Sequence, residues 1–286
     1  MAKSVTSTVK LNDGVVMPMF GLGVYLIKEE SAVLQAVTSA LKCGYRLIDT
    51  AEYYGNEEGV GKAIKASGIA RKDVFVVTKL NCHGRENCFE HFKESLKKLD
   101  LGYVDLYLIH HPIGGKILDS YDAMLELKQQ GLIRSVGVSN FNIHHLKALE
   151  AAGRPQPSVN QIELHVFLRN EGIVKYCNEH GITVMGYSPL ARMQKGDDKL
   201  LNDIAKKHQK SVAQVLIRWS VQKGYITIPK SSNPERIFEN SQVFDFELEL
   251  RRYEQLGEVA TTSVHFLAPT RCSLGGLISN VMAANN

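Results

Sequence analysis

The chain has 286 residues, 44% of them hydrophobic, and a formal net charge of +4 at pH 7. This length allows one large hydrophobic core, so a single domain is expected. No apolar run approaches the ~20 residues that cross a bilayer, and the first residues lack the apolar stretch of a secretory signal. Basic and acidic residues are mixed, which argues against a nucleic-acid surface. We expect a cytoplasmic protein without membrane or nucleic-acid partners.

A small β-hairpin is predicted at residues 7–18. Two β-prone runs, STVKL and VVMPM, flank the dipeptide Asp13-Gly14. A type I′ turn needs positive φ at both central residues, and this dipeptide favours such a turn. Because the hairpin precedes the repeating pattern of the chain, we expect it to cover one end of the main fold.

Short apolar runs of β type then alternate with longer segments of helical period. The strand candidates are GLGVY, YRLID, DVFVVTK, VDLYLIH, LIRSVGVS, PSVNQIEL, ITVMGYS and YITIPK, and no helix is assigned between the first two. Strands this apolar that alternate with helices are covered on both faces and belong to a parallel sheet.

A closed barrel and an open doubly wound sheet both satisfy this pattern. The even succession of units, the hairpin and the lack of a G-x-G-x-x-G fingerprint in the first turn favour closure. We therefore predict an α/β fold, a (β/α)₈ TIM barrel over residues 19–256, with the hairpin at its bottom and a tail at 257–286.

Polar residues stand at or just after the ends of the predicted strands. They are Asp49, Lys79, His110, Ser139, Asn140, Gln161, Tyr187 and Lys230. Any one of them could be an ordinary loop residue, because connecting loops are polar. In a βα barrel, however, the carboxyl ends of the strands converge on one rim, where active sites lie. The whole set therefore indicates a functional site.

Four residues at this rim could form a chemical unit. The pKa of a phenol is about 10, and an adjacent ammonium stabilises the phenolate. Lys79 could supply that ammonium to Tyr54, and Asp49 could hold Lys79 charged. His110 could orient a carbonyl oxygen by hydrogen bonding. This combination suits the reduction of a carbonyl group.

At these residues the sequence resembles the aldo-keto reductases, from about Val9 to about Leu250. The matching segments are GYRLIDTAEYYGNEEGVG, VFVVTKL, DLYLIHHP, GVSNFN, VNQIELH, GYSPL and IPKSSNPERIFEN. The resemblance implies carbonyl reduction with Asp49, Tyr54, Lys79 and His110 as the catalytic set. It selects Tyr54 over Tyr53, and His110 over His111.

The resemblance also implies NADPH as the cofactor. The residues expected to bind it are Ser139, Asn140, Gln161, Tyr187, Ser188, Leu190, Lys230, Ser231, Ser232, Arg236, Glu239 and Asn240. Tyr187 would stack on the nicotinamide. Lys230 and Arg236 could both reach a 2′-phosphate near a helix N-terminus, which favours NADPH over NADH.

The expected substrate is a small carbonyl compound in a pocket lined by Val24, Tyr25, Tyr53, Leu80 and His111. The tail after Leu256 departs from the family pattern, so the sequence does not determine which carbonyl compound is the substrate. We expect a monomer, with the tail as the candidate contact if the protein forms oligomers.

Three other functions are weighed against this one. A nucleotide-sensing subunit on the same barrel would not need the intact catalytic set. A metal-dependent hydrolase would need H-x-H pairs, which the sequence lacks, and a short-chain dehydrogenase would need Y-x-x-x-K, which is also absent. Cys82, His83, Cys88 and His91 have none of the usual zinc spacings, so no metal is expected.

Overall fold

The main body of the protein is a barrel of parallel strands. The computed structural model describes residues 2–249. The barrel strands are β3 (Leu22–Gly23), β4 (Leu47–Asp49), β5 (Phe75–Leu80), β6 (Val104–Ile109), β7 (Ile133–Ser139), β8 (Val159–Glu163), β9 (Thr183–Tyr187) and β10 (Ile226–Ile228). They pair in chain order from β3 to β10. Parallel bridges from Phe20 to Thr227 and from Gly23 to Lys230 join the two ends. The predicted (β/α)₈ barrel is confirmed.

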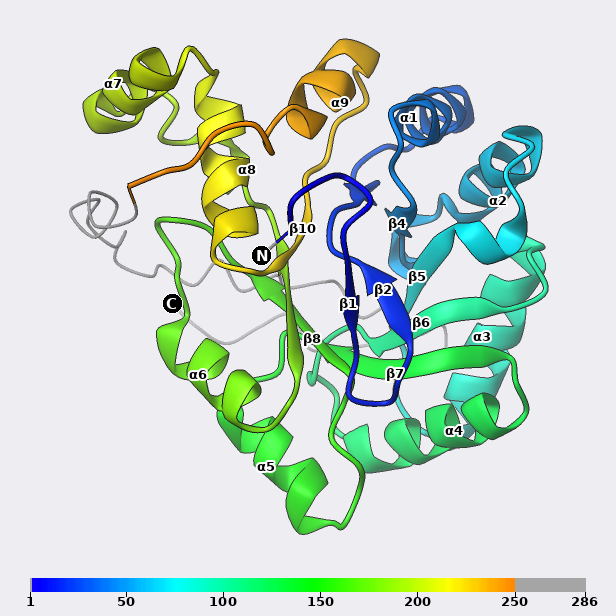
Figure 1. The fold of residues 1–286 in the computed structure, drawn as a ribbon. Helices are drawn as coiled ribbons and strands as arrows, with labels where there is room; N and C mark the ends of the chain where they lie inside the picture. Colours follow the sequence, from blue (N-terminus) through cyan, green and yellow to red (C-terminus); the bar gives the residue numbers. More distant parts are fainter. Residues whose placement is uncertain (1, 250–286) are drawn as a thin grey trace, which may run out of the picture.

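Helices surround the barrel (Figure 1). They are α1 (Glu30–Lys42), α2 (Glu57–Ala66), α3 (Arg85–Leu99), α4 (Ile117–Gln129), α5 (Ile143–Ala151), α6 (Glu171–Glu179), α7 (Lys199–His208), α8 (Val212–Gln222) and α9 (Pro234–Ser241). Helix α1 was not among the predicted elements. Its buried residues Val33, Ala36, Val37, Ala40 and Leu41 recur at helical spacing, so the signal is present in the sequence.

The hairpin of β1 (Thr8–Lys10) and β2 (Val16–Pro18) is antiparallel, as predicted. Figure 1 shows it lying across the barrel. Leu11 and Met17 are buried in one apolar cluster with side chains from six of the barrel strands. Asp13 accepts a 2.8 Å hydrogen bond from Ser135, near the amino end of β7. The hairpin therefore closes the amino end of the barrel, and the carboxyl end is left for the site.

The predicted end of the barrel at residue 256 and the tail at 257–286 lie outside the described residues, so this division of the chain stays a prediction. Within residues 2–249, no helix combines the length and the apolar character needed to cross a membrane.

Candidate active site

The four residues of the predicted catalytic set come from three neighbouring βα units. Asp49 is the last residue of β4, Lys79 lies one residue before the end of β5, and His110 directly follows β6. Tyr54 ends a short 3₁₀ turn, η1 (Glu52–Tyr54), which follows β4. Because β4, β5 and β6 are paired in register, these side chains share one sector of the carboxyl rim.

The Lys79 ammonium connects three of these groups. Its Nζ donates to Asp49 Oδ1 at 2.7 Å and lies 3.2 Å from the Tyr54 hydroxyl oxygen. It also donates to the Thr50 carbonyl at 2.8 Å. The side chains of Lys79 and Asp49 are 0% and 3% exposed. Gln161 donates to the second Asp49 oxygen at 2.7 Å, so the buried carboxylate has partners on both oxygens.

The protonation state of Tyr54 differs from the simplest expectation. Burial raises the pKa of Tyr54 well above its usual value, and the negative charge of Asp49 acts in the same direction. Burial also lowers the pKa of Lys79, against the effect of Asp49. A lone ammonium would lower the pKa of the phenol, but here the ammonium is paired with a carboxylate. The expected lowering is therefore wrong for this arrangement, and Tyr54 is a protonated phenol at neutral pH.

His110 is held in its neutral form. Burial lowers the pKa of His110 well below its usual range, and the positive charge of Lys79 acts in the same direction. Its ring lies 5.8 Å from the Tyr54 ring, centroid to centroid. A neutral imidazole carries one N–H donor and one acceptor. His110 is thus a hydrogen-bonding group beside the phenol rather than a second cation.

A hydrogen-bonded chain continues around the rim. Tyr187, the last residue of β9, donates to the Asn140 side-chain oxygen at 2.9 Å. The Asn140 amide donates to the His110 carbonyl at 2.9 Å, and Ser139 donates to the Gln161 carbonyl at 2.9 Å. Asn140 has a φ of 61°, a conformation that asparagine tolerates better than most residues. Gln161 lies inside β8 rather than after its strand, because β8 pairs with β9 as far as Glu163.

The segment after β9 holds two further predicted cofactor residues. Ser188 has a φ of 52°, and Leu190 packs on the apolar core. Arg192 lies in the same segment and was not predicted as a site residue. Burial raises the pKa values of Tyr25 and Tyr187, and the positive charge of Arg192 acts in the opposite direction. This segment therefore places a cation beside two tyrosines of the rim.

The start of α9 has the features of an anion site. Lys230 and Arg236 are exposed, and neither side chain has an ion pair within residues 2–249. Asn233 caps α9, accepting from the Arg236 backbone N–H at 3.0 Å. Free N–H groups and a partial positive charge at a helix N-terminus favour phosphate. Two cations beside this terminus fit the phosphate expected there.

The other predicted residues of this region are placed around the same helix. Ser231 is buried, and its hydroxyl oxygen accepts from the Asn233 backbone N–H at 3.1 Å. Ser232 is exposed, Glu239 is partly buried and Asn240 is buried. Asn240 is 4% exposed, whereas Lys230 and Arg236 are exposed.

The predicted substrate pocket is divided between core and rim. Val24 and Leu80 are fully buried in the main apolar cluster. Tyr25, Tyr53 and His111 lie around the catalytic rings instead. The Tyr25 ring is 4.9 Å from that of Tyr54, and the rings of Tyr53 and His111 are 6.3 Å and 5.9 Å from that of His110. Tyr25 thus lies beside the phenol, and Tyr53 and His111 lie beside His110.

Two residues outside the predicted site set also lie in this region. His83 stacks on His111 with ring centroids 5.2 Å apart, and its Nδ1 lies 2.8 Å from the Gly115 carbonyl oxygen. The buried Asn56 accepts from Thr50 at 2.7 Å and donates to the Val24 carbonyl at 3.0 Å. These residues act through contacts between loops, which local sequence patterns do not show.

The residues of the segment from Cys82 to His91 that could be compared with a zinc site have separate partners. His83 lies against Gly115, whereas His91 is 2.5 Å from a Glu52 oxygen and Cys88 is a buried free thiol. Within residues 2–249 no group of three or more histidine, cysteine or acidic side chains has the arrangement of a metal site.

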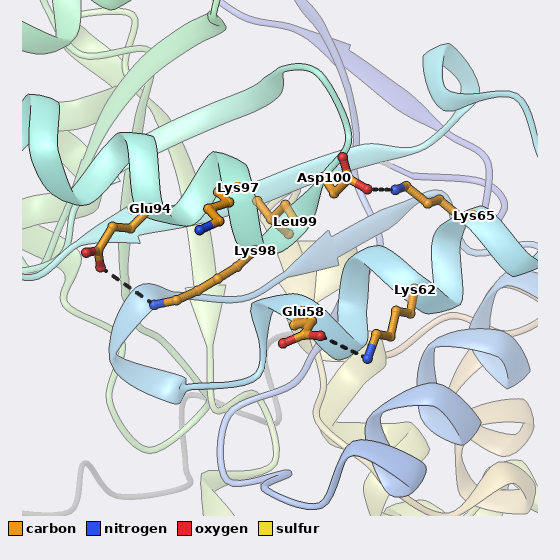
Figure 2. Close-up of a pocket in the computed structure, with 8 residues that line it drawn as sticks. All are labelled: Glu58, Lys62, Lys65, Glu94, Lys97, Lys98, Leu99 and Asp100. Carbon is orange, nitrogen blue, oxygen red and sulfur yellow. Dashed lines mark hydrogen bonds and ion pairs between the residues drawn. The ribbon is translucent and has the colours of Figure 1, made fainter.

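A separate hollow lies on the outer surface between α2 and α3 (Figure 2). It is lined by Glu58, Lys62, Lys65, Glu94, Lys97, Lys98, Leu99 and Asp100. Lys62 pairs with Glu58, Lys65 with Asp100 and Lys98 with Glu94. Most of the charged side chains of this hollow are therefore paired with one another.

Comparison with known proteins agrees with the barrel fold. Residues 20–261 match the model of the aldo/keto reductase family. The chain is 46% identical to glyoxal reductase of Bacillus subtilis, over 87% of this chain and 91% of the relative. Its structure is similar to the crystal structure of an aldo/keto reductase from Brucella melitensis, with a TM-score of 0.83, 45% identity and coverage of 87% and 97% of the two chains.

A Bombyx mori aldo-keto reductase solved in complex with NADP is also similar. Its TM-score is 0.81 and its identity 38%, with coverage of 89% of this chain and 92% of that one.

Proposed function

The chain belongs to the aldo/keto reductase family and is an oxidoreductase, and from this premise we propose that it reduces small aldehydes and ketones with NADPH, with Tyr54 as the proton donor. The observation that carries the proposal is the 3.2 Å contact between Lys79 Nζ and the Tyr54 hydroxyl at the carboxyl rim. A protonated phenol beside a buried ammonium is suited to giving up a proton and stabilising the resulting oxyanion.

NADPH, when bound, supplies the hydride that reduces the carbonyl carbon. The Tyr54 hydroxyl donates a hydrogen bond to the carbonyl oxygen and passes its proton to that oxygen as negative charge develops there. Lys79 then donates to the Tyr54 oxygen, and Asp49 keeps the ammonium in place. The neutral His110 supplies a further hydrogen bond that orients the carbonyl.

Side chains around the rim are arranged to hold NADPH. Lys230 and Arg236 would hold the 2′-phosphate at the start of α9, where each could make charge-assisted hydrogen bonds. The amides of Asn140 and Gln161 would bind the carboxamide, and the nicotinamide would stack on the ring of Tyr187. The NADP complex of the Bombyx mori protein supports this assignment, since the two folds agree over most of both chains.

The substrate class is proposed from the residues near Tyr54 and His110 and from the relatives. The ring of Tyr25 lies beside that of Tyr54, and the rings of Tyr53 and His111 lie beside that of His110. The similar Bacillus subtilis protein is a glyoxal reductase, so a small dicarbonyl is the first substrate to test. We place the enzyme in the cytoplasm as a monomer.

A nucleotide-sensing subunit is the alternative, and single-turnover kinetics separate the two functions. Protein loaded with one equivalent of NADPH is mixed with glyoxal, and the nicotinamide absorbance is followed. A reductase oxidises close to one equivalent per site. Binding of NADPH without oxidation, across a panel of small aldehydes and ketones, would favour the sensor.

A further inference from the structure

The turn that carries Tyr54 is short and has little backbone support of its own. η1 has three residues and no side-chain cap. Two backbone hydrogen bonds close it, from Tyr54 to the Ala51 carbonyl at 3.0 Å and from Gly55 to the Glu52 carbonyl at 3.1 Å. A single 3₁₀ turn has weaker hydrogen-bond geometry than an α-helix. The position of the phenol therefore depends on contacts outside the turn.

Glu52 supplies such contacts, through both oxygens of its carboxylate. One oxygen lies 2.5 Å from Nδ1 of His91 on α3. The other accepts from the backbone N–H of Asn81, directly after β5, at 3.3 Å. The side chains of Glu52 and His91 are 15% and 24% exposed. One carboxylate thus joins η1, the end of β5 and the outer helix α3.

The residues that make these contacts are close in sequence to Tyr54 and Lys79. Glu52 precedes Tyr54 by two residues, and Asn81 follows Lys79 by two residues. The carboxylate therefore connects the backbone that carries the phenol to the backbone that carries the ammonium. An error of about 1 Å in the position of a reacting group can cost about 10²-fold in rate.

From this geometry we infer that Glu52 and His91 are positioning residues, which hold the Tyr54 hydroxyl against Lys79 by tying η1 to β5 and α3. Neither residue touches the reacting atoms in this account. The inference rests on the proposed role of Tyr54 as the proton donor. Beyond the proposed catalytic set, Glu52 and His91, the latter on the outer helix α3, would influence the rate of proton transfer from Tyr54.

The test compares variants of the pair by single-turnover reduction of glyoxal and by the dissociation constant of NADPH. Glu52→Ala should slow the reduction about tenfold or more while changing the NADPH dissociation constant less than twofold. His91→Ala should slow it less, because the contact to Asn81 remains. His91→Asn keeps an N–H donor near the position of Nδ1 and should recover most of the rate.

Arg85→Gln is the matched control, because it removes a contact from the same helix without touching η1. Arg85 pairs with Glu126 at 2.5 Å and so joins α3 to α4. The single-turnover rate of the Arg85→Gln variant should stay within twofold of that of the parent protein. If Glu52→Ala does not fold, the comparison of His91→Ala with His91→Asn carries the test.

A double-mutant cycle with Tyr54→Phe separates this inference from the proposed function. If Glu52 acts through Tyr54, Glu52→Ala should slow the Tyr54→Phe protein less than twofold. The inference is overturned if Glu52→Ala and His91→Ala leave the parent rate unchanged while Tyr54→Phe is slow, or if Glu52→Ala is equally harmful in both backgrounds. A Tyr54→Phe protein as fast as the parent would instead overturn the proposed function.

Discussion

The ammonium nitrogen of Lys79 lies 3.2 Å from the hydroxyl oxygen of Tyr54, although the two residues are carried by different βα units. The same nitrogen is bound to Asp49 at 2.7 Å, so the phenol faces an ion pair rather than an isolated cation. Burial and the negative charge of Asp49 both raise the pKa of Tyr54, so the phenol stays protonated. It also makes the pair a structural feature whose loss should be measurable.

Replacing Lys79 by methionine should destabilise the folded protein. The change leaves the Asp49 carboxylate buried without its cation, and breaking a buried ion pair on one side costs about 3–5 kcal/mol. The free energy of unfolding in urea should fall by about that amount. The double variant Asp49→Asn, Lys79→Met should recover part of the loss. Equal stability of the single and double variants would contradict the role of the pair.

Replacing Lys230 by alanine should weaken NADPH binding by about 1.5–3 kcal/mol, the range for a hydrogen bond to a charged group. NADH lacks the 2′-phosphate, so its binding should change little. Fluorescence titration with both cofactors measures the difference. Lys223→Ala, at an exposed position before β10, is the control. Equal weakening of NADPH and NADH would remove the 2′-phosphate assignment.

Two substitutions of Tyr187 should separate its ring from its hydroxyl. Tyr187→Phe loses the hydrogen bond to Asn140 but keeps the ring, so NADPH affinity should fall by about 1 kcal/mol or less. Tyr187→Ala loses the ring as well and should cost about 0.5–1.5 kcal/mol more. Calorimetric titration of NADPH compares them. Identical affinities for the phenylalanine and alanine variants would argue against stacking.

The Glu52–His91 contact should make stability depend on pH. The hydrogen bond to Glu52 raises the pKa of His91, burial opposes this, and Glu90 and Glu94 on α3 add to the increase. A raised pKa in the folded state means that the stabilisation is complete below the unfolded value of about 6.5 and disappears as pH rises through the folded value.

The free energy of unfolding of His91→Asn should therefore differ most from that of the parent protein near pH 5.5. The difference should shrink toward pH 8. Urea denaturation at several pH values measures it. A difference that stays constant over this range would show that the charge of His91 does not contribute.

Much of the fold could be predicted because the signals are local. Apolar runs marked all eight barrel strands, and Asp13-Gly14 marked the hairpin. Polar residues at strand ends then predicted Asp49, Lys79 and His110 as neighbours, since parallel strands share one rim. Helix α1 was missed although the spacing of Val33, Ala36 and Val37 indicates it.

The rest of the site depends on contacts that no local pattern contains. Glu52 and His91 are far apart in the sequence and meet only because η1 packs beside α3. Burial and the negative charge of Asp49 raise the pKa of Tyr54, and neither effect can be read from the presence of Lys79 in the sequence. Arg192 reaches the rim through a segment with positive φ values, which the sequence did not indicate.

The role of Tyr54 is tested most directly by single-turnover reduction of glyoxal in the Tyr54→Phe variant. The phenylalanine keeps the ring but has no proton to donate, so the rate of NADPH oxidation should fall by about 10²-fold or more. The dissociation constant of NADPH should remain within about twofold of the parent value, because the proposed cofactor contacts lie on other residues. An unchanged rate of oxidation in this variant would contradict the account.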